Sequence, residues 1–191
     1  MNSSPTSLTS ERARAWQRLL AAKPPAWVAA HCRAVEGLAV AMGDAAERRG
    51  LEPDRSRLQQ GALLHDIGRS VTQDVHHASV GARLLREDHW DEAVVRIVER
   101  HTGGGIDATD ARDLGIPVKD YTPRSLEERI VCHADNLFSG ERRLHMAELG
   151  DKYRAKNLPA AWAKIQALHA ALCDELGVDL ETLPAVALPE P

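Results

Sequence analysis

Apolar residues recur in this chain at spacings of three and four positions, and this periodicity restricts its fold more than any other feature. One helical face of the stretch 26–49 carries Val28, His31, Val35, Leu38 and Met42. Aromatic residues make up only 4% of the chain, so the core has to come from Leu, Val, Ile and Ala, which suits closely packed helices. No stretch gives a convincing β-hairpin signal. The sequence therefore predicts an all-α helical bundle.

Helix boundaries are predicted from capping residues and from glycine and proline. The expected helices run from Thr9 or Ser10 to Pro24, over about 26–49, from the turn 51–54 to His65, onward from the polar loop 69–76, from Asp91 to the glycines 103–105, from Ser125 to beyond Asp135, and over about 140–155 and 159–175. The long connection 102–124 is expected to be functional or mobile. Three parts are predicted: an N-terminal tail and helix at 1–25, a core domain at 26–140, and C-terminal helices at 141–191 that pack on the core.

Charge and cysteine content argue against several classes of protein. The net charge of −4 gives no basic excess, so a nucleic-acid polymer is not the expected partner. Cys32, Cys132 and Cys173 form no C-x-x-C pair and are interpreted as reduced thiols. The N-terminus is polar, and no apolar run approaches the roughly 20 residues that span a bilayer. We therefore expect a cytoplasmic protein without a membrane partner.

The tetrapeptide His65-Asp66-Ile67-Gly68 follows a helix that is predicted to be buried. Adjacent His and Asp side chains cannot face the same way on a regular helix. Both can reach one ion where the helix ends, and Gly68 permits that end. Imidazole nitrogens and carboxylate oxygens bind metal ions, and a carboxylate can also bridge two of them. The tetrapeptide is therefore a candidate metal-binding element.

Three further residues with metal-binding side chains border apolar helix faces. His31 lies between Val28 and Val35, and a buried imidazole needs a partner for each of its nitrogens. His101 stands at the end of an apolar face, and Asp135 borders another. A buried carboxylate without a partner is costly, and a cation removes that cost. These positions are therefore candidate ligands as well.

The order of His31, His65-Asp66 and Asp135 resembles the H…HD…D signature of the HD superfamily, in its HDIG form. Elements of its dinuclear members are similar to the stretches His77-Ala78-Ser79-Val80-Gly81-Ala82, His101-Thr102-Gly103-Gly104 and Val131-Cys132-His133-Ala134-Asp135-Asn136. The likeness covers about 31–137. It extends to HD-type hydrolases that split dinucleoside tetraphosphates symmetrically and, more closely over 61–137, to uncharacterised archaeal and bacterial HDIG proteins.

This resemblance implies a helical bundle with a metal site at its centre. It implies a metal-dependent phosphohydrolase that cleaves a phosphoester or phosphoanhydride of a nucleotide or dinucleotide by a metal-activated hydroxide. The implied ligands of one or two divalent metal ions are His31, His65, Asp66, His77, His101 and Asp135. The ligand set admits Fe, Mn, Co, Ni, Zn or Mg, and iron or manganese is favoured. Asp66 is the implied catalytic residue.

Candidate substrate-binding residues lie near this set. Arg69 follows the HDIG stretch and is expected to contact phosphate, with a surface salt bridge as the alternative. His76 is expected to contact substrate, or to replace its neighbour as a ligand. Lys119 is a candidate for the mouth of the site, with a solvated surface as the alternative. Tyr121 is the one base-stacking candidate within 102–124, and His133 is expected on a helix surface.

Two other classes of function stay open. A few HD relatives use the same six ligands with mixed-valent iron to oxidise C–H bonds with O₂, so a di-iron oxygenase is one alternative. A non-catalytic regulatory module that binds a metal or another ligand is the second. The Ala-rich helix expected over 159–175 is a packing surface, either within the bundle or against a second subunit, so a homodimer is also open.

Overall fold

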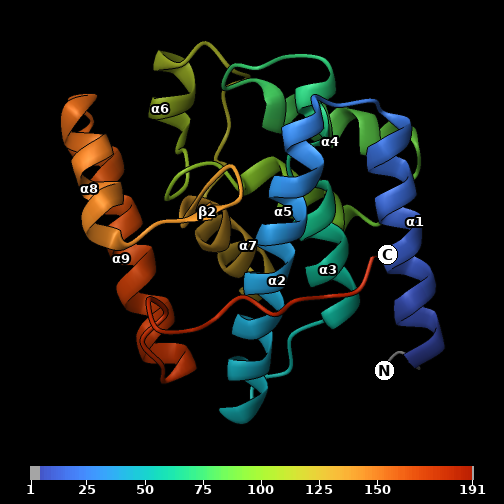
Figure 1. Ribbon diagram of the computed structural model, residues 1–191. Helices are drawn as coiled ribbons and strands as arrows, with labels where there is room; N and C mark the ends of the chain where they lie inside the picture. Colours follow the sequence, from blue (N-terminus) through green and yellow to red (C-terminus); the bar gives the residue numbers. More distant parts are fainter. Residues whose placement is uncertain (1–4, 191) are drawn as a thin grey trace.

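The helix α2 (Ala26–Arg48) lies at the centre of the fold, because apolar side chains line more than one of its faces. The computed structural model describes residues 5–190 and confirms the prediction of an all-helical protein (Figure 1). Its elements in chain order are α1 (Pro5–Ala21), α2, α3 (Arg55–Leu64), the 3₁₀-helix η1 (Ile67–Ser70), α4 (His77–Glu87), α5 (Glu92–Arg100), α6 (Ala108–Asp113), α7 (Leu126–Asn136), β1 (Phe138–Ser139), β2 (Arg142–Arg143), α8 (Met146–Ala155) and α9 (Pro159–Leu176).

The two largest apolar clusters in the described chain meet along α2. Val28 and Cys32 belong to the cluster that also contains α1 and α4 side chains. Val35 and Leu38 belong to the cluster shared with α7 and α9. Each fully buried side chain of this size stabilises the fold by roughly 1.5–3 kcal/mol. His31 lies between the two clusters, so the core itself holds this imidazole in place.

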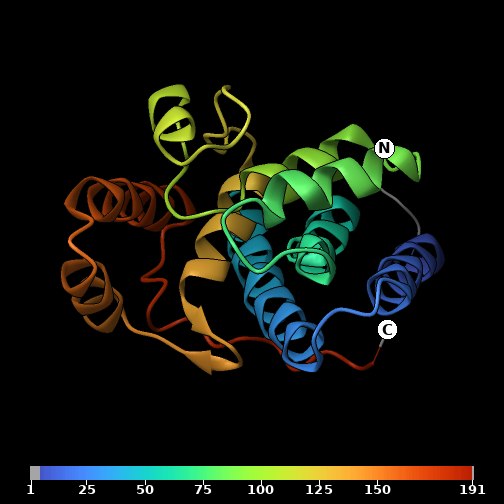
Figure 2. The same ribbon diagram turned by 90° about the horizontal axis from the view of Figure 1, so that it is seen from above.

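The helices surround α2 on several sides. α3 packs against α1, α2, α5 and α7, and α4 packs against α5 and η1. Seen from above, α8 and α9 lie at one side of the molecule and α1 at the other, with α2 and α7 between them (Figure 2). In the described part of the chain, no helix is both long enough and apolar enough to cross a membrane.

The N-terminal helix is longer than expected. It begins at Pro5 rather than at Thr9 or Ser10. Proline fits the first turn of a helix, where its missing N–H would have no partner, so Pro5 is compatible with this earlier start. The remainder of the expected N-terminal tail, residues 1–4, lies outside the described residues.

The expected helix over 140–155 is wrong in its first part, and so is the expectation of no hairpin. β1 and β2 pair antiparallel, with Phe138 opposite Arg143. Gly140 has a φ of 61°, a left-handed value that glycine adopts readily, and it makes the turn. The helix α8 then starts only at Met146. Strands of two residues carry no periodic pattern, so the sequence could not reveal them.

The connection 102–124 is not a loop throughout. Asp107 and Asp110 form a capping box that starts α6, and Lys164 of α9 bonds both carboxylates. A small apolar cluster contains Ile116 and Tyr121 together with Ala111 of α6. This connection therefore has its own ordered structure.

The C-terminal tail runs back across α2 to α1 (Figure 1). The Val186 N–H donates to the Gly37 carbonyl at 3.0 Å, and the Arg12 guanidinium donates to the Pro189 carbonyl at 2.8 Å. A Cβ on Gly37 would lie 2.5 Å from the Val186 carbonyl oxygen, so only glycine allows this approach. The irregular tail thereby joins the two ends of the chain.

Candidate metal centre

The six predicted ligands come from five different segments and are brought together by the fold. His31 projects from the middle of α2, and Asp135 from the last turn of α7. His65 follows the last residue of α3 and Asp66 precedes η1, so the end of one helix presents both side chains. The first residue of α4 is His77, and His101 directly follows α5. His31, His65, Asp66, His77 and His101 are at most 5% exposed.

The four imidazoles form two pairs. The Nε2 atoms of His31 and His65 lie 3.2 Å apart, and those of His77 and His101 lie 3.0 Å apart. Asp135 contacts the first pair, with its Oδ1 at 2.9 Å from the Nε2 of His31 and 3.5 Å from that of His65.

Asp66 lies between the two pairs. Its Oδ1 is 3.2 Å from the Nε2 of His77 and 3.6 Å from that of His101. Its Oδ2 is 3.8 Å from the Nε2 of His31 and from that of His65. Asp66 can therefore bind at both pairs, as a bridging carboxylate does.

Backbone carbonyls fix the tautomer of each imidazole. The Nδ1 atoms of these histidines lie 2.7–2.8 Å from a carbonyl oxygen: His31 from Gly140, His65 from Ala62, His77 from Asp74 and His101 from Val98. A carbonyl oxygen can only accept, so each Nδ1 carries the proton and donates it. The Nε2 of each neutral ring is then a lone pair directed at the centre. Second-sphere carbonyls orient metal-binding histidines in this way.

Two facing lone pairs at 3.0–3.2 Å repel each other unless a cation lies between them. The Oδ1 of Asp66 is also buried and has no hydrogen-bond donor. Among the described side chains, only the Arg69 guanidinium donates into this set, with its Nε 2.6 Å from Asp66 Oδ2 and its Nη2 3.3 Å from His77 Nε2. The other imidazole lone pairs and carboxylate oxygens converge without a proton to satisfy them. This donor set fits divalent cations with mixed nitrogen and oxygen ligation.

The carboxylates and His77 have the charge that metal binding requires, whereas at His65 burial lowers the pKa but the nearby Cys32 and Asp66 outweigh it and hold the pKa above its usual value. Burial raises the pKa of Asp135, but the neighbouring His31 and His65 outweigh burial and hold the pKa well below its usual value. Burial and the nearby His101 lower the pKa of His77 to about 4, so His77 is neutral at pH 7. Deprotonated carboxylates and neutral imidazoles are the forms that bind metal.

Of the three predicted substrate-binding residues, the structure places Arg69 at the centre. Its Nε donates to Asp66 Oδ2 at 2.6 Å. His76 instead lies within 3.0 Å of an Asp74 carboxylate oxygen, and Lys119 pairs with Glu99 at 2.7 Å. Among the described contacts, none joins His76 or Lys119 to the six central residues.

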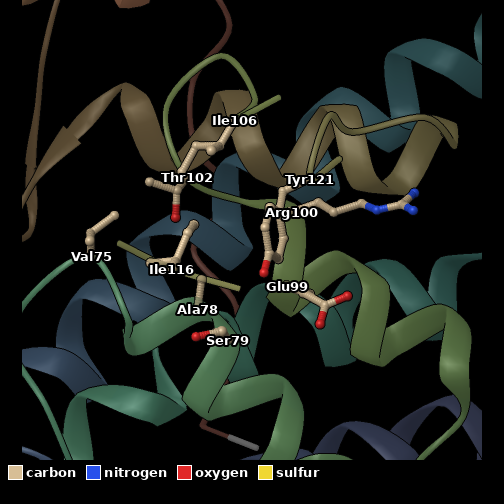
Figure 3. A pocket seen from close by; sticks show the side chains of 9 residues that line it. All are labelled: Val75, Ala78, Ser79, Glu99, Arg100, Thr102, Ile106, Ile116 and Tyr121. Atoms are coloured by element: carbon tan, nitrogen blue, oxygen red, sulfur yellow. The ribbon is translucent and has the colours of Figure 1, made fainter. Parts of the chain in front are cut away.

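A small cavity lies beside the centre, between α4, α5 and the connection 102–124 (Figure 3). Its lining includes Ala78, which follows His77, and Thr102, which follows His101. It has room for about one water molecule. Tyr121 lines it but is only 3% exposed, and its hydroxyl donates to the Pro117 carbonyl. Tyr121 is therefore not available to stack on a base in this structure.

The surface position expected for His133 is wrong. This imidazole is fully buried between α7 and α9, with its Nε2 at 2.9 Å from His169 Nδ1. Burial, aided by His169, lowers its pKa to about 3. The ligand atoms of His169, Cys173 and Asp179 lie within 4.8 Å of one another beyond it. The expectation failed because α9 covers this face of α7, which the pattern of α7 alone does not show.

Trp27 belongs to no motif in the sequence, yet it lies beside the centre. Its ring centroid is 6.2 Å from that of His31 and 5.6 Å from the guanidinium carbon of Arg69. The spacing of four between Trp27 and His31 was the available signal, because such residues share a helix face.

Comparisons with known proteins agree with this architecture. The model of the HD domain family matches residues 28–139. The crystal structure of the HD domain of the L. monocytogenes phosphodiesterase PgpH has a TM-score of 0.50 and 18% identity, and the match covers 88% of this chain and 96% of that chain. At this identity the similarity shows a common fold.

Two curated proteins are more similar in sequence. The tRNA (cytidine(56)-2'-O)-methyltransferase of Picrophilus torridus is 45% identical over 153 residues, which are 80% of this chain and 43% of that protein. An uncharacterized protein of Methanocaldococcus jannaschii is 44% identical over 136 residues, 70% of this chain and 80% of that protein. The chain thus spans less than half the length of the first of these relatives.

Proposed function

This chain belongs to the HD domain family, and we propose that it is a metal-dependent phosphohydrolase that cleaves a phosphoester or phosphoanhydride of a nucleotide. The observation that carries the proposal is that four imidazole nitrogens and two carboxylates point toward the same centre. That arrangement suits two divalent cations better than one, because the four rings lie side by side in the order His31, His65, His101 and His77, and an Asp66 oxygen lies within 3.8 Å of each Nε2 atom. Iron or manganese suits this nitrogen-rich set.

Divalent cations bound there would act as Lewis acids on phosphoryl oxygens and would lower the pKa of a coordinated water. The residues of the chain hold and orient the reacting groups. Asp66 stays ionised although burial raises its pKa, because His65 and His101 lower it further. In this ionised form it can orient the attacking water, or accept a proton from it. Arg69, beside Asp66, is placed to neutralise a phosphoryl oxygen.

The names of similar proteins support parts of this proposal. PgpH is a phosphodiesterase, and its HD domain was also solved in complex with cyclic-di-AMP, a small nucleotide. The Picrophilus relative is named for an activity on tRNA, but this chain matches only 43% of it. The absence of a nucleic-acid partner, predicted from charge, therefore stays a prediction and belongs in the test.

The test is a hydrolysis screen of the metal-loaded full chain on mononucleotides, dinucleotides, dinucleoside polyphosphates and a short RNA. Fe(II) under anaerobic conditions and Mn(II) should each support turnover of at least one nucleotide, and a chelator should stop it. Oxygen uptake is measured in parallel with Fe(II) in air. It distinguishes an oxygenase, which consumes O₂, from a hydrolase, which does not. Metal-dependent oxygen uptake without hydrolysis of any ester would overturn the proposal.

A further inference from the structure

Trp27 is the most exposed tryptophan of the chain. Its exposed fraction is 47%, whereas Trp16 and Trp90 are 8% and 7% exposed and Trp162 stacks on Tyr153. An indole in water forgoes the stabilisation that burial gives the others. The ring contacts His31 and Arg69, and the rest of its surface is in solvent, where a ligand can reach it.

Trp27, Arg69 and Asp66 lie next to one another at the edge of the metal centre, and we call this edge the rim. Trp27 precedes His31 by four residues on α2, and the ring centroids are 6.2 Å apart. The guanidinium carbon of Arg69 lies 5.6 Å from the indole centroid, while the Nε of the same side chain donates to Asp66. Indole, guanidinium and metal-binding carboxylate therefore follow one another in space.

Solvent reaches the centre on this side. The Asp135 side chain is 23% exposed and that of Arg69 is 22% exposed, whereas the side chains of the four histidines are at most 6% exposed. Asp135 touches His31, and Trp27 lies beside the same ring. On the side of α6, the cavity has room for about one water molecule, too little for a base.

We propose that Trp27 is the stacking surface for the base of a nucleoside phosphate whose phosphate binds at the metal centre beside Arg69. This inference rests on the proposed function and specifies its substrate: a phosphate ester with a planar base one ribose away from the phosphorus. A sugar phosphate or inorganic phosphate has no base to stack on the indole, so Trp27 should not increase its affinity. A free nucleotide and the phosphorylated end of an RNA strand share this chemistry.

The experiment compares the affinity of the Mn(II)-loaded full chain for AMP and for ribose 5-phosphate by calorimetry. Wild type should bind AMP about fivefold to 150-fold more tightly, the range that stacking on an aromatic side chain supplies. Trp27→Ala should remove this preference by weakening AMP binding, and Trp27→Phe should keep most of it. Trp162→Phe, away from the rim, is the matched control and should keep the full preference.

Equal affinity of wild type for the two ligands would overturn the inference. So would a Trp27→Ala variant that weakens both to the same extent, or that keeps the preference. A 5′-phosphorylated oligoribonucleotide that binds more tightly than AMP through Trp27 would identify an RNA end as the source. Hydrolysis is scored separately, in the nucleotide screen described above. An AMP preference without hydrolysis of any nucleotide in that screen would reject the proposed function and retain this site.

Discussion

Asp66→Ala is expected to lose the bound divalent metal and to lower kcat/KM for phosphoester hydrolysis by at least about a thousandfold. Asp66 is the one residue whose two oxygens approach both histidine pairs. Its removal is therefore expected to weaken metal binding throughout the centre and to take away the group proposed to orient or deprotonate the attacking water. Metal catalysis supplies several kcal/mol of transition-state stabilisation, and about 4 kcal/mol corresponds to a thousandfold in rate.

Two variants make this result interpretable. Asp66→Asn keeps the size of the side chain and removes its charge, so it should be as deficient as Asp66→Ala. Asp151→Ala alters an exposed carboxylate paired with Arg154 and should match wild type in activity and metal content. Circular dichroism establishes that each variant is folded. Full activity in Asp66→Ala would contradict the assigned role.

Gly68→Ala is expected to destabilise the protein by about 3 kcal/mol or more, and to lower Tm by about 6–12 °C. A Cβ on Gly68 would lie 1.9 Å from the His77 carbonyl oxygen and 2.7 Å from the Gly81 nitrogen. Both are backbone atoms of α4, so the helix as a whole has to move away from η1. His77 is the first residue of α4, and the variant should therefore also lose metal from the second histidine pair.

Gly50→Ala is the matched control for Gly68→Ala. No atom lies within 4 Å of a Cβ at position 50, but its φ of 77° strains any side chain. That strain alone costs about 1–2 kcal/mol. Thermal unfolding in the presence of chelator compares the two variants without a contribution from bound metal. An equal loss of stability in both would contradict the close approach of η1 to α4.

The sequence could predict which residues meet but not how they meet. Apolar periodicity placed His31 on a core face, and the end of a helix at Gly68 placed His65 and Asp66 together. The sequence explained Gly68 by backbone freedom, whereas the structure shows that the near contact with α4 excludes any side chain there. Three of the carbonyl partners of the Nδ1 atoms lie three residues before their histidine in the chain, whereas Gly140, the partner of His31, comes from a distant segment and could not be predicted from α2 alone.

The errors share a physical cause. The hairpin at 138–143 is too short for a period, and the burial of His133 is decided by α9, whose contact with α7 is long-range. The proximity of Trp27 to Arg69 likewise requires α2 and η1 to be placed against each other. Local pattern determines the helices, and tertiary packing determines the surroundings of each side chain.

The central claim is that two histidine pairs hold two cations, and metal content per chain tests it most directly. The protein is purified without chelator under anaerobic conditions, and its metals are counted by mass spectrometry in wild type and in His77→Ala. About two ions per wild-type chain, falling to about one in the variant, is the predicted result. About one ion in both proteins would confine the site to His31, His65, Asp66 and Asp135 and would contradict the two-cation centre.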